Sequence, residues 1–429
     1  MLFCDYNVTG LYFIDYLLTL VMLIITTINI NKIINFIRNQ KVVFYYSLLL
    51  FIILVIISFL RSNGGGSMND NIRKALLFIS FILATISFFV DYKPRRFFLF
   101  NKSNDSFFFF LLILPIAYLV LNLLFKFLSI DIFNFLKDSS NSIGRSESIY
   151  YFTGVEINRS SFPLSNGINN FGSFSGATCV LLLSFFITTK KKKYKIIALS
   201  LSILSLIALL LLDTRSAMLA IIAILLGTYF LNEFTYLKIA KYIIIIIPLL
   251  PVILVVSNFF LHFLYNFTFL MRSDEESGTA NGRDSIWIYC LMELMDFKFI
   301  HLFGFGEFGH VGSKISNLWS DGFTNYEDSK YITTHNLLLQ LIFDIGYVGA
   351  LVYYTLIISA SNCIFEMYQV TKNKNVLIFQ NFILFFSFVG GSEAINVHKS
   401  TFLLMFFFFI CLIYYKKRIL TSKLIKNQS

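Results

Sequence analysis

Residues 196–231 read IIALSLSILSLIALLLLDTRSAMLAIIAILLGTYFL, which is two apolar blocks separated by four residues. The first block ends at Leu212 and the second begins at Ala217. As helices, the blocks would be roughly 22 to 26 Å long, close to the thickness of a hydrocarbon core of about 30 Å. Because so short a connection turns the chain back at once, the sequence predicts two antiparallel membrane helices with Arg215 at the membrane surface.

The composition of the whole chain agrees with a membrane protein. Hydrophobic residues make up 57% of the 429 residues and charged residues only 14%, and the mean hydropathy is +0.74. Soluble domains carry about 25% charged residues, so a soluble globular enzyme is excluded. The net charge of +11 comes largely from Lys and Arg in short loops beside apolar blocks. The sequence contains no basic face interleaved with aromatic residues, so nucleic acid is not indicated as a partner. The expected partner is the lipid bilayer.

Apolar blocks recur along the chain and predict about eleven transmembrane helices in one membrane domain, residues 1–429. The fold class is therefore an all-α polytopic membrane protein. The predicted inner loops are short and basic, which by the positive-inside rule places the N-terminus outside and the C-terminus in the cytoplasm. The predicted spans lie near residues 10–30, 42–60, 75–90, 107–128, 174–188, 196–212, 217–231, 242–260, 336–361, 376–391 and 401–414.

Two large outer segments, 131–173 and 261–335, are rich in Ser, Asn, Gly and charged residues. Chemistry outside the bilayer is expected there. Within the second, residues 284–297 place Ile286, Cys290 and Leu294 on one helical face. This spacing predicts an amphipathic helix lying on the outer leaflet, which would hold Arg283 at the level of lipid phosphates.

Ionisable residues are scarce within the predicted spans. Asp15, Asp344 and Lys126 are the main ones, whereas a transporter or channel normally keeps such groups near the midplane. This scarcity favours chemistry at the outer surface over conduction, with a flippase for a lipid-linked substrate as an alternative. The five cysteines contain no CxxC pair and no strict DxD motif occurs, so neither a zinc site nor another metal site is predicted.

Three outer arginines lie beside predicted span ends: Arg159, Arg215 and Arg283. The planar guanidinium fork matches phosphate oxygens, and several converging forks could bind a diphosphate. The plain alternative is that each arginine is solvated at the membrane surface. The tight turn at 213–216 makes that alternative weakest for Arg215.

His335 lies at the start of the ninth predicted span, in the sequence TTHNLLLQ. An imidazole there could accept a proton from a sugar hydroxyl at neutral pH. Taken alone, a helix-start residue that pairs with backbone is the simpler interpretation. The surrounding residues form a longer pattern, in which His335-Asn336 is followed after nine residues by Gly346-x-x-Gly349.

This pattern resembles the bacterial O-antigen ligase and O-antigen polymerase superfamily. Three further motifs are similar to the same superfamily: Gly282-Arg283 followed by Trp287, residues 303–306 (FGFG) and residues 214–217 (TRSA). The resemblance covers most of residues 150–360. It implies a GT-C-like membrane glycosyltransferase of the bacterial inner membrane that acts on undecaprenyl-diphosphate-linked glycans at the periplasmic face, without a metal or other cofactor.

The resemblance also implies roles for individual residues. Arg215 and Arg283, with Arg159, would bind the substrate diphosphate, and His335 would be the catalytic base or orient the acceptor. Candidate glycan contacts are Asn336, Glu307 and His310, each of which also fits an ordinary polar loop position.

The chemistry supports an inverting transfer independently of the family. Nucleotide donors are not expected outside the inner membrane, so the donor must be preactivated, and a lipid diphosphate is a suitable leaving group whose charge the arginines would stabilise. We expect an O-antigen polymerase, because abundant Phe, Ile, Asn and Lys suggest an A/T-rich gene, as resembling polymerases often have. An O-antigen ligase acting on lipid A core, or a capsule or exopolysaccharide polymerase, remain alternatives. Expected partners include a chain-length regulator and the flippase of the pathway.

Overall fold

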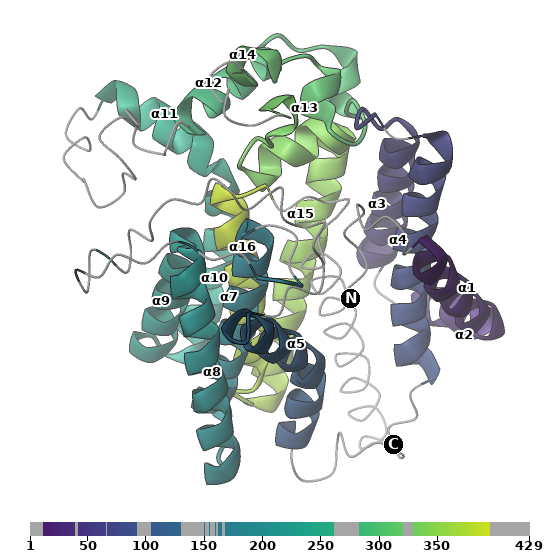
Figure 1. Ribbon diagram of the computed structural model, residues 1–429. Coiled ribbons are helices and arrows are strands. Elements are labelled where there is room, and N and C mark those ends of the chain that lie inside the picture. The colour runs from purple at the N-terminus through teal and green to yellow at the C-terminus, as the bar shows by residue number, and fades with distance from the viewer. Residues whose placement is uncertain are drawn as a thin grey trace.

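In the computed structural model of the protein, every regular element of the described residues is a helix (Figure 1). The described residues are 12–38, 42–65, 67–91, 104–129, 150, 154, 159, 162–164, 168–260, 283–320 and 329–394.

The predicted spans coincide with helices wherever the chain is described, and the last one, 401–414, lies outside the described residues. Among the described residues, four helices are long and apolar enough to cross a membrane by length and composition: Phe171–Thr188, Lys192–Leu212, Glu233–Val255 and Leu337–Thr371. The chain is therefore an all-helical membrane protein, and the number eleven and the GT-C class stay predictions. The helices at the predicted spans are α1 (Tyr12–Ile28), α3 (Val42–Leu60), α4 (Met68–Asp91), α5 (Asn104–Phe127), α7 (Ile168–Thr188), α8 (Lys192–Leu212), α9 (Arg215–Phe230), α10 (Glu233–Ile246) with α11 (Leu250–Phe260), α15 (Leu337–Thr371) and α16 (Val376–Ser392).

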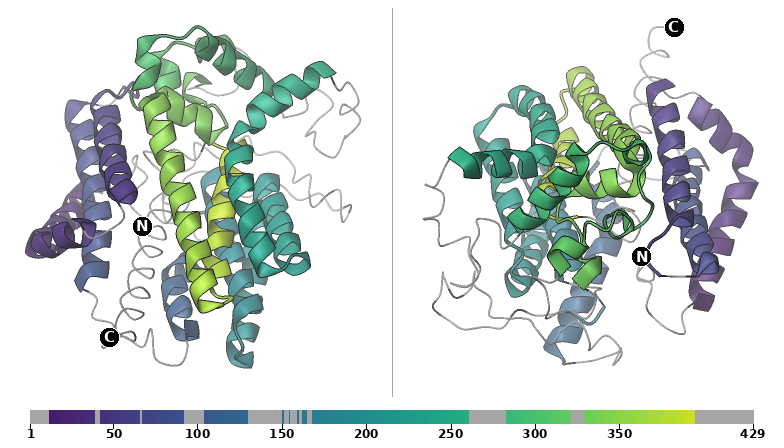
Figure 2. Two further views of the ribbon diagram at one scale, coloured as in Figure 1. Left: turned by 180° about the vertical axis from the view of Figure 1, so that it is seen from behind. Right: turned by 90° about the horizontal axis from the view of Figure 1, so that it is seen from above.

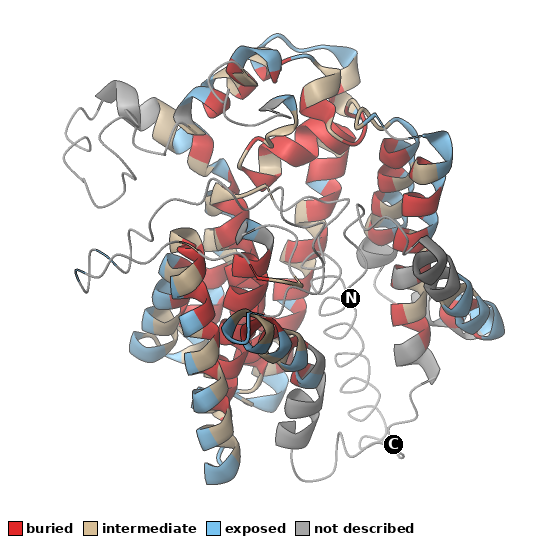
Figure 3. Ribbon diagram, viewed as in Figure 1, coloured by how far each residue is buried: buried red, intermediate tan, exposed pale blue. Residues whose placement is uncertain are grey.

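The helices α15 and α16 lie side by side in the centre (Figures 1 and 2). Almost every residue of α16 is buried, as the red ribbon in Figure 3 shows. Hydrocarbon does not drive apolar helices together, so their association depends on close packing and on polar bonds between helices. One such bond joins Asn381 of α16 to Tyr236 of α10 at 2.6 Å, and another joins Asn381 to Ser184 of α7 at 2.8 Å.

The first helices form a group on one side of this centre. Helix α4 packs on α1, on the short α2 (Ile30–Arg38) and on α3, and α3 also packs on α15. Phe51 of α3 and Tyr353 of α15 are in ring contact at 5.7 Å between centroids. The group of α1–α4 is thereby attached to the centre chiefly through α3.

Short elements of residues 283–331 cover one end of the bundle, which we call the loop end; the sequence predicts that it faces outside. They are α12 (Arg283–Met295), η5 (Phe299–Leu302), α13 (Gly309–Gly312), α14 (Asn317–Ser320) and η7 (Ser329–Tyr331).

Helix α15 is broken at Gly346, which has φ +78° and ψ 177°. A Cβ at this position would lie 2.2 Å from the Leu302 carbonyl oxygen, so both the backbone angle and the close approach of η5 require glycine. The prediction of one continuous span near 336–361 is thus corrected. Residues 337–345 form a first arm and residues 347–371 a second, longer arm.

A second break separates α10 from α11. The 3-10 turn η2 (Ile247–Leu249) contains Pro248, and Pro251 follows at the start of α11. Proline removes a backbone donor and clashes with the preceding turn. The predicted span near 242–260 is therefore bent between Ile246 and Leu250.

Helix α12 lies where the sequence places an amphipathic helix, but its predicted apolar face packs on protein. Ile286, Trp287 and Cys290 are at most 2% exposed, and the Trp287 indole N–H donates to the Thr334 carbonyl at 2.9 Å. This face is therefore unavailable to a lipid leaflet, which corrects the expectation for it.

Candidate active site

The turn between α8 and α9 fixes the position of Arg215. Asp213 ends α8 in the left-handed conformation (φ 52°, ψ 46°), and its N–H donates to the carbonyls of the preceding turn. Asp tolerates this conformation better than most residues. Thr214 packs directly on Gly172 of α7, where an added Cβ would lie 2.2 Å from the threonine methyl group. Arg215 therefore begins α9 close against α7.

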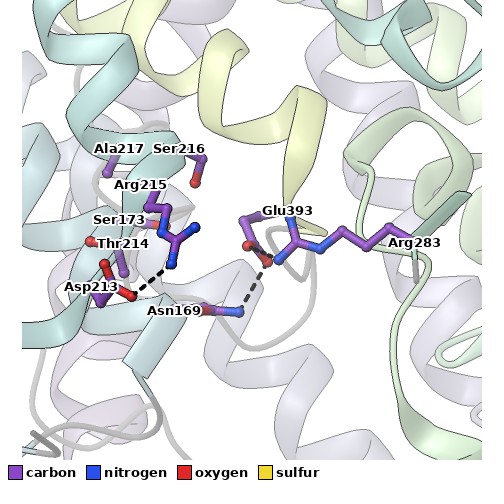
Figure 4. A pocket seen from close by; sticks show the side chains of 9 residues that line it. All are labelled: Asn169, Ser173, Asp213, Thr214, Arg215, Ser216, Ala217, Arg283 and Glu393. Atoms are coloured by element: carbon purple, nitrogen blue, oxygen red, sulfur yellow. Dashed lines mark hydrogen bonds and ion pairs between the residues drawn. The ribbon is translucent and has the colours of Figure 1, made fainter. Parts of the chain in front are cut away.

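A small cleft, partly open to solvent, lies at this turn. It brings together three helix starts, those of α7, α9 and α12, and the end of α16 (Figure 4). Its walls are polar at most positions. The lining residues are Asn169, Ser173, Asp213, Thr214, Arg215, Ser216, Ala217, Arg283 and Glu393.

Two of the arginines singled out from the sequence line this cleft from different helices. Arg215 Nη2 lies 3.4 Å from the Asp213 carboxylate. Arg283, the first residue of α12, donates to the Ser392 carbonyl and to Glu393 Oε1, both at 2.7 Å. Each guanidinium is thus held beside a carboxylate, and that of Arg283 is fixed through two nitrogens.

Glu393 connects the cleft to His335. One carboxylate oxygen binds Arg283, and the other accepts from Asn169 Nδ2 at 3.1 Å and lies 3.4 Å from His335 Nδ1. Burial alone would raise the pKa of Glu393, but the charge of Arg283 and the hydrogen bond from His335 outweigh it and lower the pKa to about 2. Glu393 is therefore a carboxylate at every pH of interest.

Glu393 was not predicted as a site residue from the sequence. The only signal available was an acid directly after a predicted span, in the sequence GGSEA. Such acids are common on membrane surfaces, and the contacts with Arg283 and His335 come from segments 110 and 58 residues away.

Asn336 holds His335 in place from within the protein. Asn336 is fully buried, caps α15 by accepting from the Leu339 N–H at 3.0 Å, and donates to the Gly391 carbonyl at 3.0 Å. His335 itself has φ +48° and a side chain 20% exposed. Through these two bonds, the capping residue Asn336 joins the start of α15 to the end of α16, next to Glu393.

Glu307 and His310 lie deeper than the loop positions expected for them. Both are fully buried. Glu307 forms an ion pair with Lys74 at 2.9 Å, and His310 Nδ1 lies 3.1 Å from Gln340 Nε2 and its ring stacks on Trp319. Glycan contact by these residues, or by buried Asn336, stays a prediction, and each has a packing role in this structure.

Arg159 lies next to the turn but outside the lining of the cleft. Its Nε donates to the Leu212 carbonyl at 3.0 Å, at the end of α8. The cleft residues thus supply two guanidinium groups, hydroxyl and amide donors, and a carboxylate beside an imidazole. This set can bind a polyanion and accept a proton nearby. Among the described residues, no three His, Cys, Asp or Glu side chains are grouped as metal ligands would be.

Residues 200–354 match a family model described as O-antigen ligase. The superfamily resemblance is confirmed. The matched segment contains Arg215, Arg283 and His335, and ends before Glu393. It supports a glycosyltransferase-like enzyme with O-antigen polymerase or ligase activity. Curated proteins gave no match to the chain.

Proposed function

We propose that the protein is an O-antigen polymerase, which transfers the growing glycan from undecaprenyl diphosphate to the next lipid-linked repeat unit. The observation that carries this proposal is the shared cleft of Arg215 and Arg283, with Glu393 joining it to His335. The reaction takes place at the periplasmic face of the bacterial inner membrane, with the N-terminus outside and the C-terminus in the cytoplasm.

The reaction is a single displacement at the anomeric carbon of the donor glycan. The acceptor hydroxyl oxygen forms the new glycosidic bond while the bond from the anomeric carbon to the diphosphate oxygen breaks. The lipid diphosphate leaves with the bonding electron pair, and the configuration inverts. No nucleotide is needed, because the donor is already activated, and the proposed mechanism assigns the charge of the leaving group to arginines rather than to a metal.

The arginines bind the diphosphate and stabilise the negative charge that develops as it leaves. Arg215 lies 3.4 Å from the Asp213 carboxylate and Arg283 lies 2.7 Å from the Glu393 carboxylate, so both guanidinium groups reach the cleft from beside an acid. Arg159 strengthens the positive charge at the end of α8.

His335 accepts the proton of the acceptor hydroxyl at Nε2. Its other ring nitrogen, Nδ1, lies beside Glu393. A carboxylate in that position orients the imidazole and stabilises the imidazolium that forms. Glu393 is thus a positioning residue, and Asn336 supports it by joining α15 to α16.

An O-antigen ligase is the second candidate, because the matching family model carries that description. It would use the same donor and the same cleft and differ only in its acceptor, the lipid A core. The partners we propose for a polymerase are the lipid-linked oligosaccharide, the bilayer, a chain-length regulator and the flippase of the pathway.

The test is the lipopolysaccharide ladder of a strain that lacks the gene, with and without complementation. Lipid A core carrying one repeat unit identifies a polymerase, because ligation continues. Bare core with long polymer left on its lipid carrier identifies a ligase. Bare core with repeat units trapped inside identifies a flippase and overturns the proposal.

Complementation with variants tests the site. Arg215→Ala, Arg283→Ala and His335→Ala should each abolish polymer while the amount of protein in the membrane stays the same. Lys330→Ala, which removes an exposed cation from the same loop end, is the matched control and should restore the full ladder. Normal chain lengths in all three site variants would refute the assignment of the site.

A further inference from the structure

Helix α12 has two apolar faces, and only one of them packs on protein. Opposite the buried face, Ile288, Met292 and Met295 are 39%, 60% and 84% exposed. These positions follow the i, i+4, i+7 spacing and therefore share one side of the helix. Figure 3 shows exposed residues in pale blue along α12.

The chain that follows α12 extends this surface with three aromatic rings. Phe297, Phe299 and Phe303 are 59%, 74% and 46% exposed, and the rings of Phe299 and Phe303 are 6.0 Å apart. We call these residues the α12 patch: Ile288, Met292, Met295, Phe297, Phe299 and Phe303. Soluble surfaces rarely leave so many large apolar side chains together without a partner.

The α12 patch adjoins the start of the long arm of α15. The Phe297 ring stacks on Tyr347 at 6.4 Å, and Tyr347 is the first residue after the break at Gly346. The arm from 347 to 371 would be roughly 37 Å long, enough to cross a bilayer. One turn beyond Tyr347, Leu351 is 70% exposed, as a lipid-facing residue would be.

We propose that the α12 patch is inserted into the bilayer surface at the loop end, at the boundary between headgroups and acyl chains. Two features favour lipid over a protein partner. The Phe297–Tyr347 contact joins the patch to α15 one turn before the exposed Leu351, and the patch is rich in aromatic rings, which concentrate at membrane interfaces. Lys298, between Phe297 and Phe299 in the sequence, is 47% exposed and forms ion pairs with Glu293 at 2.7 Å and Asp296 at 3.4 Å, so these charges beside the patch are paired.

Insertion fixes the depth of the candidate active site. Arg283 is the first residue of α12, the helix that carries part of the patch on its exposed face. Anchoring α12 in the bilayer surface therefore holds this guanidinium near the plane of lipid phosphates. Only this consequence rests on the proposed function. Membrane contact by the patch does not depend on any reaction.

The test places a fluorescent probe on the patch in the full-length chain, reconstituted in vesicles of phosphatidylethanolamine and phosphatidylglycerol. Cys4 and Cys411 are first changed to Ser, and the cysteines at 179, 290 and 363 are buried. An NBD label is then attached to Phe299→Cys, to Leu351→Cys on the long arm of α15, and to Asn317→Cys. The last is an exposed position on α14 of the same loop end and serves as the aqueous control.

Lipids carrying a nitroxide near the top of the acyl chain should quench the probes at 299 and 351 to a similar extent. The probe at 317 should be quenched at most one third as much. Quenching at 351 with none at 299 would overturn the proposal. So would efficient energy transfer or crosslinking between copies through position 299, because the patch would then be covered by a second chain.

A paired variant shows whether insertion depends on the apolar character of the patch. Adding Met295→Asp and Met292→Asp to the labelled Phe299→Cys chain should reduce quenching at 299 at least twofold and leave quenching at 351 unchanged. Unchanged quenching at both positions would refute insertion through the patch. Retained quenching at 351 also shows that the variant is folded in the membrane.

Discussion

One carboxylate oxygen of Glu393 lies 3.4 Å from Nδ1 of His335, although the two residues are 58 positions apart. The other oxygen binds Arg283 at 2.7 Å. The same carboxylate therefore contacts the proposed base and one of the proposed phosphate ligands. Any change in its charge should affect both.

Glu393→Gln should lower polymer synthesis by about a hundredfold or more. The amide keeps the size of the side chain but removes the charge that orients and stabilises the imidazolium, and loss of such a group costs about 10²- to 10⁴-fold in comparable proton transfers. The measurement is the rate of polymer formation by purified protein in vesicles with a lipid-linked repeat unit. Glu393→Asp should recover part of the rate. Equal rates in Glu393→Gln and the unchanged protein would exclude the positioning role.

Arg283→Lys should fail to replace Arg283. The arginine reaches the Ser392 carbonyl and the Glu393 carboxylate through two nitrogens, which a single ammonium group cannot reproduce in the same geometry. Loss of one charge-assisted bond of about 1.5–3 kcal/mol corresponds to roughly a ten- to hundredfold slower rate. Polymer length and protein amount are measured together. Lys330→Arg, a conservative exchange at an exposed position, is the control and should leave both unchanged.

The buried pair Lys74–Glu307 should be worth more to stability than a surface ion pair. Glu307 is fully buried, Lys74 is 7% exposed, and they meet at 2.9 Å between α4 and the loop before α13. Removing one partner leaves an uncompensated buried charge, which costs about 3–5 kcal/mol. We therefore expect Glu307→Ala to lower the melting temperature in detergent strongly.

The double variant Lys74→Met, Glu307→Leu should recover much of that loss, because neither charge then remains buried. Lys298→Ala removes a residue of an exposed ion pair, with Glu293, and should change the melting temperature little. An effect of Glu307→Ala as small as that of Lys298→Ala would contradict the strong contribution of the buried pair.

The positions of the helices were predictable from the sequence because the length of an apolar block is a local property. The blocks ending at Leu212 and beginning at Ala217 are helices α8 and α9, and the turn between them places Arg215 at a helix start. The breaks were harder to predict. A proline within an apolar block, such as Pro248, predicts a kink from the sequence alone. The break at Gly346 depends instead on the approach of Leu302 from another segment.

The site was predictable only in part, for the same reason. Arg215, Arg283 and His335 could be selected because each lies at a predicted span end or loop motif, but their partner Glu393 is defined by tertiary contacts alone. The packing side of α12 could not be predicted either. Both its faces carry large apolar residues, Ile286 on one and Met292 on the other, so periodicity does not determine which face contacts protein.

His310 should make stability depend on pH in the mildly acidic range. Burial lowers the pKa of His310 to about 4, although the charge of Asp344 acts in the opposite direction. The ordinary value is 6.5, so between these two values the unfolded chain binds a proton that the folded chain does not. The contribution of neutral His310 is therefore fully present above pH 6.5 and is lost as the pH falls towards 4, by about 3 kcal/mol in total.

The measurement is the melting temperature in detergent from pH 7.5 to pH 4.5, for the unchanged protein and for His310→Gln. The unchanged protein should lose stability more steeply than the variant over this range. The contribution of Glu393 begins to be lost only near its ordinary pKa of 4.5, at the lower edge of this range, and it is the same in both proteins. Parallel curves for the two proteins would show that His310 is not the group responsible.

Gly346→Ala should disrupt the corner of α15 and with it the placement of His335. A Cβ at Gly346 would lie 2.2 Å from the Leu302 carbonyl oxygen, and the φ of +78° is itself unfavourable for alanine. Gly154 has a similar φ of +71° with no atom of the described residues within 4 Å of its would-be Cβ, so Gly154→Ala serves as the comparison for the cost of the backbone angle, about 1–2 kcal/mol. Gly346→Ala should lower the melting temperature clearly more than Gly154→Ala and should shorten the polymer ladder, because the first arm of α15 must shift away from η5. If the two variants are equally stable and equally active, the close contact between Gly346 and Leu302 does not determine the position of the site.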